Sequence, residues 1–231
     1  MEHLRADYTE VWVAEPNVPL IRFADKVRSI GSTGLDRVEL GLDTPALEML
    51  RSFDSIVSWY GSNRSAFRDA MAGFPITFHD ALPRGGAHAT DFYMEQVGGR
   101  EGAIPRISCR RRRIGFVAVH PFSGSPGKNW PLENFRALAR SLPWPVCFTA
   151  GPDEPLEGAV RFNNLYELAC WLAEARLYIG NDSGITHLAA AVGTPVLAIF
   201  GPTDPLIWAP RGSNVQVLRN PSLEDCLSVL L

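Results

Sequence analysis

The sequence predicts an α/β fold built from two Rossmann-like domains. Short apolar runs alternate with segments of helical periodicity along the chain, which is the pattern of a parallel sheet covered by helices. Residues 177–205 show this most clearly, because they contain two apolar runs separated by one helix-like segment. A glycine- and arginine-rich segment at 98–113 has the composition of a linker. We therefore place one domain at residues 1–105 and the second at residues 106–231.

The first half alternates short strands with short helices. A strand pattern at 55–59 is followed by a loop that contains Gly61 and leads into a helical segment. The predicted elements, in order, are strands at 10–14, 27–30, 37–40 and 55–59, with helices at 45–50 and 65–71.

The second half begins with a strand at 114–120 that is rich in β-branched residues. Pro131 suits the first position of the next helix, and Pro143 ends it. A strand at 146–149 and a helix at 166–175 follow. The predicted apolar face of the first helix consists of Leu132, Phe135, Leu138, Ala139 and Leu142.

The segment 177–205 predicts a βαβ unit. Asp182 or Ser183 is a good N-cap, because either side chain can accept a hydrogen bond from a free amide of the first helical turn. Gly193 ends the helix, and the apolar run at 196–200 is typical of a strand covered on both faces. The helix thus begins at the carboxyl edge of a sheet, where its amides and dipole favour an anion.

Composition excludes several classes of protein. With 46% hydrophobic and 20% charged residues among 231, the chain reads as an ordinary soluble globular protein. A net charge of −3 argues against nucleic acid as a partner. The chain contains no apolar stretch of membrane-spanning length and no signal-peptide core, so any membrane contact would be peripheral. Its four cysteines are scattered without a CxxC pair, which favours a reducing cytoplasm over a disulfide framework or zinc site.

Polar residues gather where the helix of the βαβ unit begins. Asp182, Ser183 and His187 lie within about one turn, and Ser183 and His187 share a face because they are four residues apart. For any one of them, a capped helix with a solvated histidine is the simpler interpretation. Together with Gly184 and the loop at 201–205, the cluster favours a ligand site.

A second candidate is the loop at 123–131. It is not a Walker motif, because Phe122 and Asn129 stand where that motif needs glycine and Ser or Thr. A glycine-bearing turn with Lys128 can still hold a diphosphate through amides and a point charge, although a solvated lysine is the alternative. Glu154, in the loop after the strand at 146–149, can accept two ribose hydroxyls, although an exposed loop acid is commoner. No histidine–carboxylate spacing suggests a metal.

Two segments of the second half carry the patterns of a known family. They are Asn181-Asp182-Ser183-Gly184 with His187 to Ala191, Gly193-Thr194-Pro195 and Phe200 to Thr203, and His120-Pro121 with Lys128 to Phe135. These patterns resemble glycosyltransferase family nine, the heptosyltransferases of lipopolysaccharide core synthesis. The resemblance implies a GT-B fold, with two Rossmann-like domains facing a cleft, and no cofactor or metal. The donor-binding residues that it implies are Ser123, Ser125, Lys128, Glu154, Asp182, Ser183, Gly184 and His187.

The amino-terminal half resembles the family loosely, at 50–57 and 61–65. Family members open with a strand, a Gly-Asp loop and a helix, and the loop aspartate is the base that deprotonates the acceptor. This sequence shows no such opening, and residues 1–6 read as the tail of that helix. We therefore expect an incomplete amino-terminal domain that lacks about 20–30 residues, the size of a strand, loop and partial helix. The catalytic base is then unassigned, with His187 in a supporting role.

The function implied is transfer of a heptose, with inversion, from a nucleotide-diphosphate donor such as ADP-heptose to a lipopolysaccharide core or other glycolipid acceptor. Direct displacement needs a base and stabilisation of the leaving diphosphate, and Lys128, the amides of Ser183 and Gly184, and His187 meet the second need. The location implied is the cytoplasm, at the inner face of the inner membrane. Two alternatives stay open: a non-catalytic nucleotide-sugar-binding short form, and a GT-B nucleotide-sugar epimerase, which lacks its usual acid–base set here.

Overall fold

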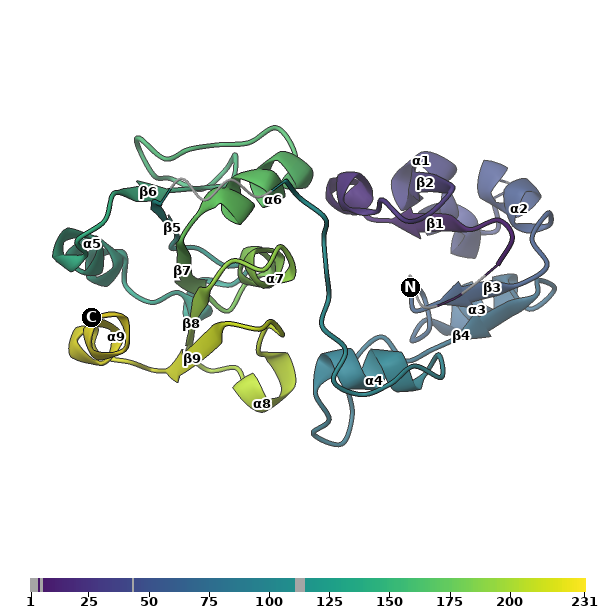
Figure 1. Cartoon of the computed structure of the whole chain (residues 1–231). Helices are drawn as coiled ribbons and strands as arrows, with labels where there is room; N and C mark the ends of the chain where they lie inside the picture. Colours follow the sequence, from purple (N-terminus) through teal and green to yellow (C-terminus); the bar gives the residue numbers. More distant parts are fainter. Residues whose placement is uncertain (1–3, 5, 43, 111–114) are drawn as a thin grey trace. The chain divides into compact units, whose positions relative to one another are not determined.

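The computed structural model describes residues 4, 6–42, 44–110 and 115–231 (Figure 1). Its contacts divide the chain into two compact units. An amino-terminal unit comprises Met1–Gly85 and Phe92–Arg100, and a carboxyl-terminal unit comprises Gly86–Asp91 and Glu101–Leu231. The domain boundary at 105/106 stays a prediction; the last change of unit along the chain falls between Arg100 and Glu101.

The carboxyl-terminal unit is built on one sheet of five parallel strands in the order β6-β5-β7-β8-β9. The chain runs from β5 outward to β6 and then crosses back to β7 on the other side of β5. The strand order therefore reverses between β5 and β7, which makes that position the topological switch point of the sheet. The strands are β5 (Val117–His120), β6 (Val146–Phe148), β7 (Leu177–Asn181), β8 (Val196–Phe200) and β9 (Val215–Arg219).

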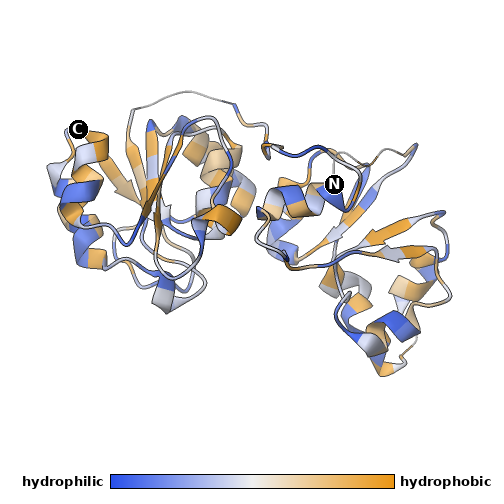
Figure 2. Ribbon diagram, turned by 90° about the horizontal axis from the view of Figure 1, so that it is seen from below, coloured by the Kyte–Doolittle hydropathy of each residue, from blue (hydrophilic) through white to orange (hydrophobic). Residues whose placement is uncertain are grey.

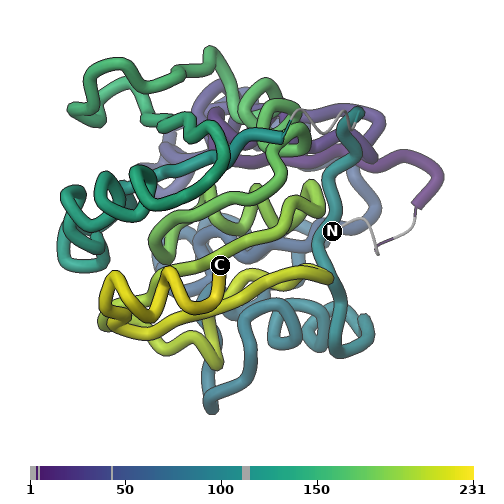
Figure 3. Tube along the Cα trace, turned by 60° about the vertical axis from the view of Figure 1, so that its left-hand side comes forward, coloured from purple at the N-terminus to yellow at the C-terminus, as the bar shows by residue number. Residues whose placement is uncertain are grey.

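Helices cover both faces of this sheet. On one face lie α5 (Leu132–Ser141) and α9 (Leu223–Leu230), which pack against each other (Figures 1 and 3). On the other face lie α6 (Leu165–Glu174) and α7 (Gly184–Ala191), which also touch. The short helices η3 (Pro126–Lys128) and α8 (Pro205–Trp208) belong to loops at the sheet edge. A parallel sheet sandwiched in this way is a doubly wound Rossmann-like unit.

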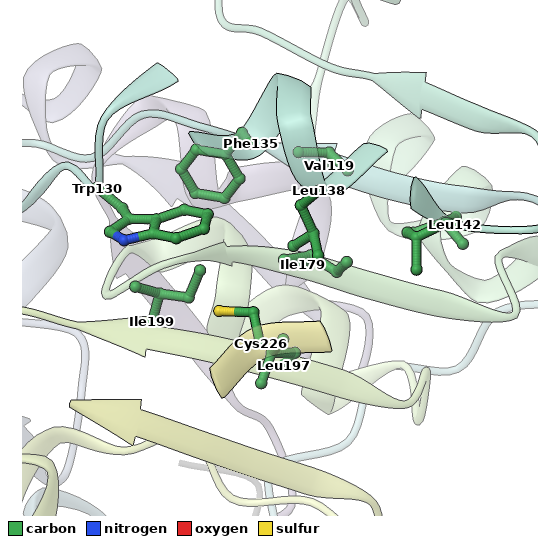
Figure 4. Close-up of a cluster of buried hydrophobic side chains, with 10 residues drawn as sticks. Val119, Trp130, Phe135, Leu138, Leu142, Ile179, Leu197, Ile199 and Cys226 are labelled. Carbon is green, nitrogen blue, oxygen red and sulfur yellow. The ribbon is translucent and has the colours of Figure 1, made fainter. Parts of the chain in front are cut away.

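The main core lies between the sheet and the α5/α9 layer (Figure 4). Alternate strand residues such as Val119 and Ile179 pack against Phe135 and Leu138 of α5. Cys226 of α9 belongs to the same core on the same face of the sheet. All five residues of β8 are buried, which confirms the prediction of a strand covered on both faces. The strands accordingly form the most apolar part of this unit, and they are mostly orange in Figure 2.

The amino-terminal unit contains two separate two-stranded parallel sheets. One pairs β1 (Glu10–Val13) with β2 (Lys26–Ser29), and the other pairs β3 (Ile56–Ser58) with β4 (Ile76–Phe78). A small core of Leu35, Val38, Ala46, Leu50, Phe67 and Met71 joins them. The helices are η1 (Glu15–Leu20), α1 (Ile30–Thr33), η2 (Leu35–Leu40), α2 (Pro45–Leu50) and α3 (Ser65–Ala70), with α4 (Ala89–Glu95) where the chain passes between the units.

One predicted strand is wrong. Residues 37–40 belong to the 3₁₀ helix η2, because Gly34 and Gly41 bracket the segment in left-handed conformations with φ of 75° and 71°. A residue with positive φ breaks an extended strand and favours a tight turn, so the segment coils and buries Val38. Ile114, in the predicted strand at 114–120, lies outside the described residues, as do Met1 to His3 and Arg5 of the expected helix tail.

Several elements were not predicted, among them β4, α4, β9 and α9. Each is short or lies beyond the last motif, and β4 has only three residues. Within the described part of the chain, no helix combines the length and apolar character needed to cross a bilayer.

Candidate functional site

The predicted site residues gather where the parallel strands of the carboxyl-terminal sheet end. Ligands of open α/β sheets bind outside the carboxyl ends of the strands at the switch point, which here lies between β5 and β7. His120, the last residue of β5, pairs in register with Gly180 of β7. The loop after β5 therefore starts beside the turn that leads from β7 into α7.

Asn181 fastens these two segments together. Its side chain is fully buried, with Oδ1 accepting from the backbone N–H of Trp130 at 2.9 Å and Nδ2 donating to the carbonyl of Pro121 at 2.8 Å. One amide thus holds both ends of the loop at 121–130. Asn181 belongs to one of the family-like motifs, but no role was predicted for it, because its partners lie 51 and 60 residues away along the chain.

Lys128 and Asp182 form an ion pair at this edge. The Nζ of Lys128 lies 3.0 Å from Oδ2 of Asp182, and the carboxylate side chain is only 7% exposed. Thr203, in the loop after β8, donates from Oγ1 to the same oxygen at 2.7 Å. Two residues predicted separately are thereby brought together. The unpredicted Thr203 could have been found in the Gly-Pro-Thr-Asp-Pro loop that follows the apolar run at 196–200.

Helix α7 presents its amino terminus at the same place. Ser183 occupies the N-cap position by backbone conformation and Asp182 does not, but the predicted hydrogen bond from a helix amide to the capping side chain is not formed. The Ser183 hydroxyl caps no amide and instead lies 3.2 Å from Oγ1 of Thr186. The first free backbone N–H groups of a helix remain available to an anion when no side chain caps them. Gly184, which begins the helix, is exposed.

Gly180 allows the strand before α7 to pack closely. A side chain at this position would collide with the ring of Tyr178, which lies on the same face of β7 and is fully buried. The Tyr178 hydroxyl lies 3.1 Å from Oγ1 of Thr186 on α7, and burial raises the pKa of the phenol. Tyr178 therefore stays neutral and holds the start of α7 against the sheet.

His187 lies one turn into α7. By accessible surface the residue is exposed, yet neighbouring groups crowd its ring, and this desolvation lowers the pKa of the imidazole below its usual 6.5. The charge of Asp182 and a backbone hydrogen bond with Trp208 act in the opposite direction, whereas His88 and Lys128 lower the pKa further. The ring is therefore neutral near pH 7 and can exchange hydrogen bonds with a diphosphate without adding charge.

We expect the ring of His187 to titrate below pH 6.5 in the folded protein, as followed by the NMR shifts of its ring protons. Because the unfolded chain then binds more protons just below pH 6.5, the contribution of His187 to the free energy of unfolding falls as the pH drops through that value. Asp182→Asn should lower the pKa of His187 further, since it removes a favourable charge. A His187 pKa at or above 6.5 would contradict this account.

Glu154 and His120 form a second pair. The Nε2 of His120 and the backbone N–H of Gly151 both meet Oε2 of Glu154, at 2.9 and 2.6 Å. Burial alone would raise the pKa of Glu154, but these hydrogen bonds and the nearby charge of Arg161 lower it below its usual value. The carboxylate is therefore ionised at neutral pH and fixed in place. Both hydrogen bonds, from His120 and from Gly151, are made to the same carboxylate oxygen, Oε2. His120, itself 4% exposed, was missed because its role depends on adjacent strands.

Ser123 and Ser125 shape the loop that carries Lys128. The hydroxyl of Ser123 lies 2.7 Å from both the carbonyl of Ser125 and Oδ1 of Asn129, and these contacts close the turn that contains η3. Contact of either serine with a ligand stays a prediction. Among the described residues, no cluster of three or more His, Cys, Asp or Glu side chains could hold a metal ion.

Contacts therefore run along the sheet edge from β6 to β8. Glu154, after β6, is hydrogen-bonded to His120 at the end of β5. The carbonyl of Pro121, after β5, accepts a hydrogen bond from Asn181 at the end of β7. Thr203, after β8, donates a hydrogen bond to Asp182, after β7. The edge offers a fixed carboxylate at one end, with a lysine and helix amides next to it. Chemically, this set can bind a diol through the carboxylate and a diphosphate through the lysine and amides.

Comparison with known proteins identifies a family. The sequence profile described as Glycosyltransferase family 9 (heptosyltransferase) matches residues 88–228. Lipopolysaccharide heptosyltransferase 3 of Escherichia coli is 31% identical over 122 residues, which cover 43% of this chain and 35% of that protein. Lipooligosaccharide heptosyltransferase 2 of Haemophilus influenzae is 29% identical over 126 residues, covering 46% and 36%. The chain thus spans about a third of the length of the curated relatives it matches.

Solved structures show the same fold. ADP-heptose lps heptosyltransferase II of E. coli superposes with a TM-score of 0.72 at 15% identity, covering 96% of this chain and 88% of that one. The glycosyl transferase family 9 protein of Veillonella parvula gives 0.66 at 19% identity, covering 96% and 79%. The fold is therefore GT-B, as predicted, and the family profile covers more than half of the sequence. The chain belongs to glycosyltransferase family 9, the heptosyltransferase family.

Proposed function

We propose that this chain binds a nucleotide-diphosphate sugar, with ADP-heptose as the donor, and takes part in heptose transfer to a lipopolysaccharide core acceptor. The observation that carries the proposal is the Lys128–Asp182–Thr203 network beside the amino terminus of α7, at the switch point of the sheet. The curated relatives of the chain are lipopolysaccharide heptosyltransferases, and the structure of a related E. coli heptosyltransferase, WaaC, has been solved with ADP.

The donor would lie along the sheet edge with its ribose toward Glu154. The ionised carboxylate, fixed by His120 and Gly151, would accept the ribose hydroxyls. The diphosphate would then meet Lys128 and the amides at Ser183 and Gly184, with neutral His187 beside it. Ser123 or Ser125 would add a hydroxyl from the lysine-bearing loop.

Transfer with inversion would be a direct displacement. An acceptor hydroxyl oxygen bonds to the anomeric carbon of the heptose as the bond from that carbon to the diphosphate oxygen breaks. The hydroxyl proton passes to a base, and the leaving diphosphate takes the negative charge. Lys128 and the α7 amides would stabilise that charge where it develops. The residues of this site supply the leaving-group half of the reaction and leave the base unassigned.

The proposed acceptor also suggests a location. A heptose-accepting lipopolysaccharide core is a glycolipid, so the chain would work in the cytoplasm at the inner face of the inner membrane, through peripheral contact. Arg110, at the start of the run of four arginines in the sequence, is a candidate for attraction to anionic headgroups.

Replacing Lys128 by alanine is expected to weaken ADP binding by about 1.5–3 kcal/mol, the usual contribution of a charged hydrogen bond. Isothermal calorimetry with ADP and with ADP-heptose measures this. Lys26→Ala is the matched control, because it removes an equal charge from an exposed site in β2 of the other unit. Thermal unfolding of both variants separates loss of affinity from loss of fold, since Asp182 loses its partner in the first. Equal affinities in the two variants would remove Lys128 from the donor site.

A further inference from the structure

The segment that follows the last change of unit along the chain is fastened to α6 and α7. The chain leaves the amino-terminal unit after Arg100, and the residues that follow lead to α6 (Figure 1). The backbone N–H of Ile107 donates to the carbonyl of Ala191, the last residue of α7, at 3.0 Å. The hydroxyl of Tyr166, in α6, donates to the carbonyl of Ser108 at 3.1 Å. These two hydrogen bonds hold the segment against both helices.

Two cysteines meet at the next residue of this segment. The Sγ of Cys109 lies 3.6 Å from the Sγ of Cys170. Cys170 follows Tyr166 by four residues in α6, so the two side chains share a face of the helix, and the sulfur contact lies beside the hydrogen bond to Ser108. Both cysteines are partly exposed, so a small reagent can reach their sulfur atoms.

The geometry of this pair suits a disulfide. Sulfur atoms in a disulfide lie about 2.05 Å apart, so the two sulfurs must approach each other by about 1.6 Å. The side chains of Cys109 and Cys170 already face each other, and side-chain rotation can supply this movement while the hydrogen bonds of Ile107 and Ser108 keep the backbone in place.

The other two cysteines lie in different surroundings. Cys147 belongs to the edge strand β6, and Cys226 is buried in the core, where burial raises the pKa of its thiol to about 11. Because the thiolate is the form that reacts with disulfides, Cys226 is inert at neutral pH.

We propose that Cys109 and Cys170 are a reversible redox site, and that their disulfide fastens the segment after Arg100 to α6. The oxidant is a low-molecular-weight disulfide such as oxidised glutathione. The thiolate of one cysteine attacks it, which forms a mixed disulfide and releases one reduced glutathione. The second thiolate attacks the mixed disulfide, closes the bond between the two cysteines and releases another. The two thiols lose two protons and two electrons, which convert one oxidised glutathione into two reduced molecules.

The state of this pair depends on its surroundings. A reducing compartment keeps two thiols, and a shift toward oxidation closes the bond. The closed bond joins residues 61 positions apart in the sequence. It also lies two residues from Ile107, so the hydrogen bond from Ile107 to Ala191 should open less often. Oxidation would thus hold residues 101–109 against the helices, whatever binds at the sheet edge.

The test incubates the whole 231-residue chain with oxidised and reduced glutathione in a series of ratios. We expect a disulfide between Cys109 and Cys170, identified by peptide mass spectrometry, which reduced glutathione opens again. The amide of Ile107 should exchange its hydrogen more slowly in the oxidised chain. The midpoint of thermal unfolding of the carboxyl-terminal unit should rise by roughly 5–15 °C, because the bond closes a long loop and restricts the unfolded chain.

Serine variants separate this pair from the other thiols. Cys109→Ser and Cys170→Ser should each keep the remaining cysteine of the pair as a mixed disulfide with glutathione, and should show neither the slower exchange nor the thermal shift. Cys147→Ser is the matched control and should cross-link as the unchanged chain does. Mixed disulfides that persist on both cysteines without closure, or a disulfide between two chains instead, would overturn the proposal. So would a closed bond that leaves exchange at Ile107 unchanged, because the segment would then not be fastened.

Discussion

Replacing Asn181 by alanine is expected to lower the free energy of unfolding by roughly 2–6 kcal/mol, because each buried polar group left without a partner costs about 1–3 kcal/mol. The two groups are the N–H of Trp130 and the carbonyl of Pro121, which the side chain of Asn181 now satisfies at 2.9 and 2.8 Å. Both residues and Asn181 itself are buried, so water cannot easily replace the lost bonds. Urea denaturation measures the change.

The same substitution should weaken ADP binding. Lys128 sits in the loop whose two ends Asn181 fastens, and its Nζ reaches Asp182 only while that loop stays docked. A positioned charge that becomes mobile must be ordered again when ligand binds, and this ordering lowers affinity. Asn181→Ala should therefore weaken ADP binding in calorimetry although Asn181 itself donates nothing to the ligand in this account.

Asn214→Ala is the control, because Asn214 belongs to the same unit and is exposed. Surface substitutions of this kind usually change stability by no more than about 0.5 kcal/mol. A loss in Asn181→Ala as small as that in Asn214→Ala would show that neighbouring groups or water replace both hydrogen bonds. Unchanged ADP affinity in a destabilised Asn181→Ala would instead show that the loop stays docked without this amide.

The predicted elements are most accurate where local pattern and burial agree. The run at 196–200 is apolar at every position and forms β8, which is buried throughout. The predicted apolar face forms α5, with Phe135 and Leu138 in the core, although Pro131 is the N-cap residue and the helix begins one residue later. The segment 37–40 failed because its apolar residues fit a short strand as well as a turn, and only the backbone of Gly34 and Gly41 decides between them.

Residues of the candidate site could be predicted from the sequence where they lie close together in one motif. Asp182, Ser183 and His187 are close in sequence, and Lys128 was identified from its glycine-bearing loop. The ion pair between Lys128 and Asp182 joins residues 54 positions apart and depends on β5 and β7 being neighbours. His120 and Asn181 were missed for the same reason, because each works on a segment from an adjacent strand.

Supplying a base is expected to have the largest effect on turnover. We expect these 231 residues on their own to bind ADP-heptose but to transfer its sugar poorly, because the residues of the proposed donor site stabilise the leaving diphosphate and none of them is assigned as the base. A positioned general base commonly contributes a factor of about 10² to 10⁴. Adding the strand, Gly-Asp loop and helix of a family member before Met1 should raise transfer by a factor of that order, while ADP affinity at the carboxyl-terminal unit changes little. Transfer from ADP-heptose to a lipopolysaccharide core acceptor is the assay.

An extension of this kind could act in two ways, and a single substitution in it separates them. The added strand could stabilise the amino-terminal unit, while the loop aspartate takes the acceptor proton. Changing that aspartate to asparagine keeps the strand and removes the base, so the added stability should remain and the gain in transfer should disappear. A gain that survives the change would mean that stabilisation, not proton transfer, limits the shorter chain. Equal transfer with and without the extension would place the base within these 231 residues, because only a base already present could support that rate.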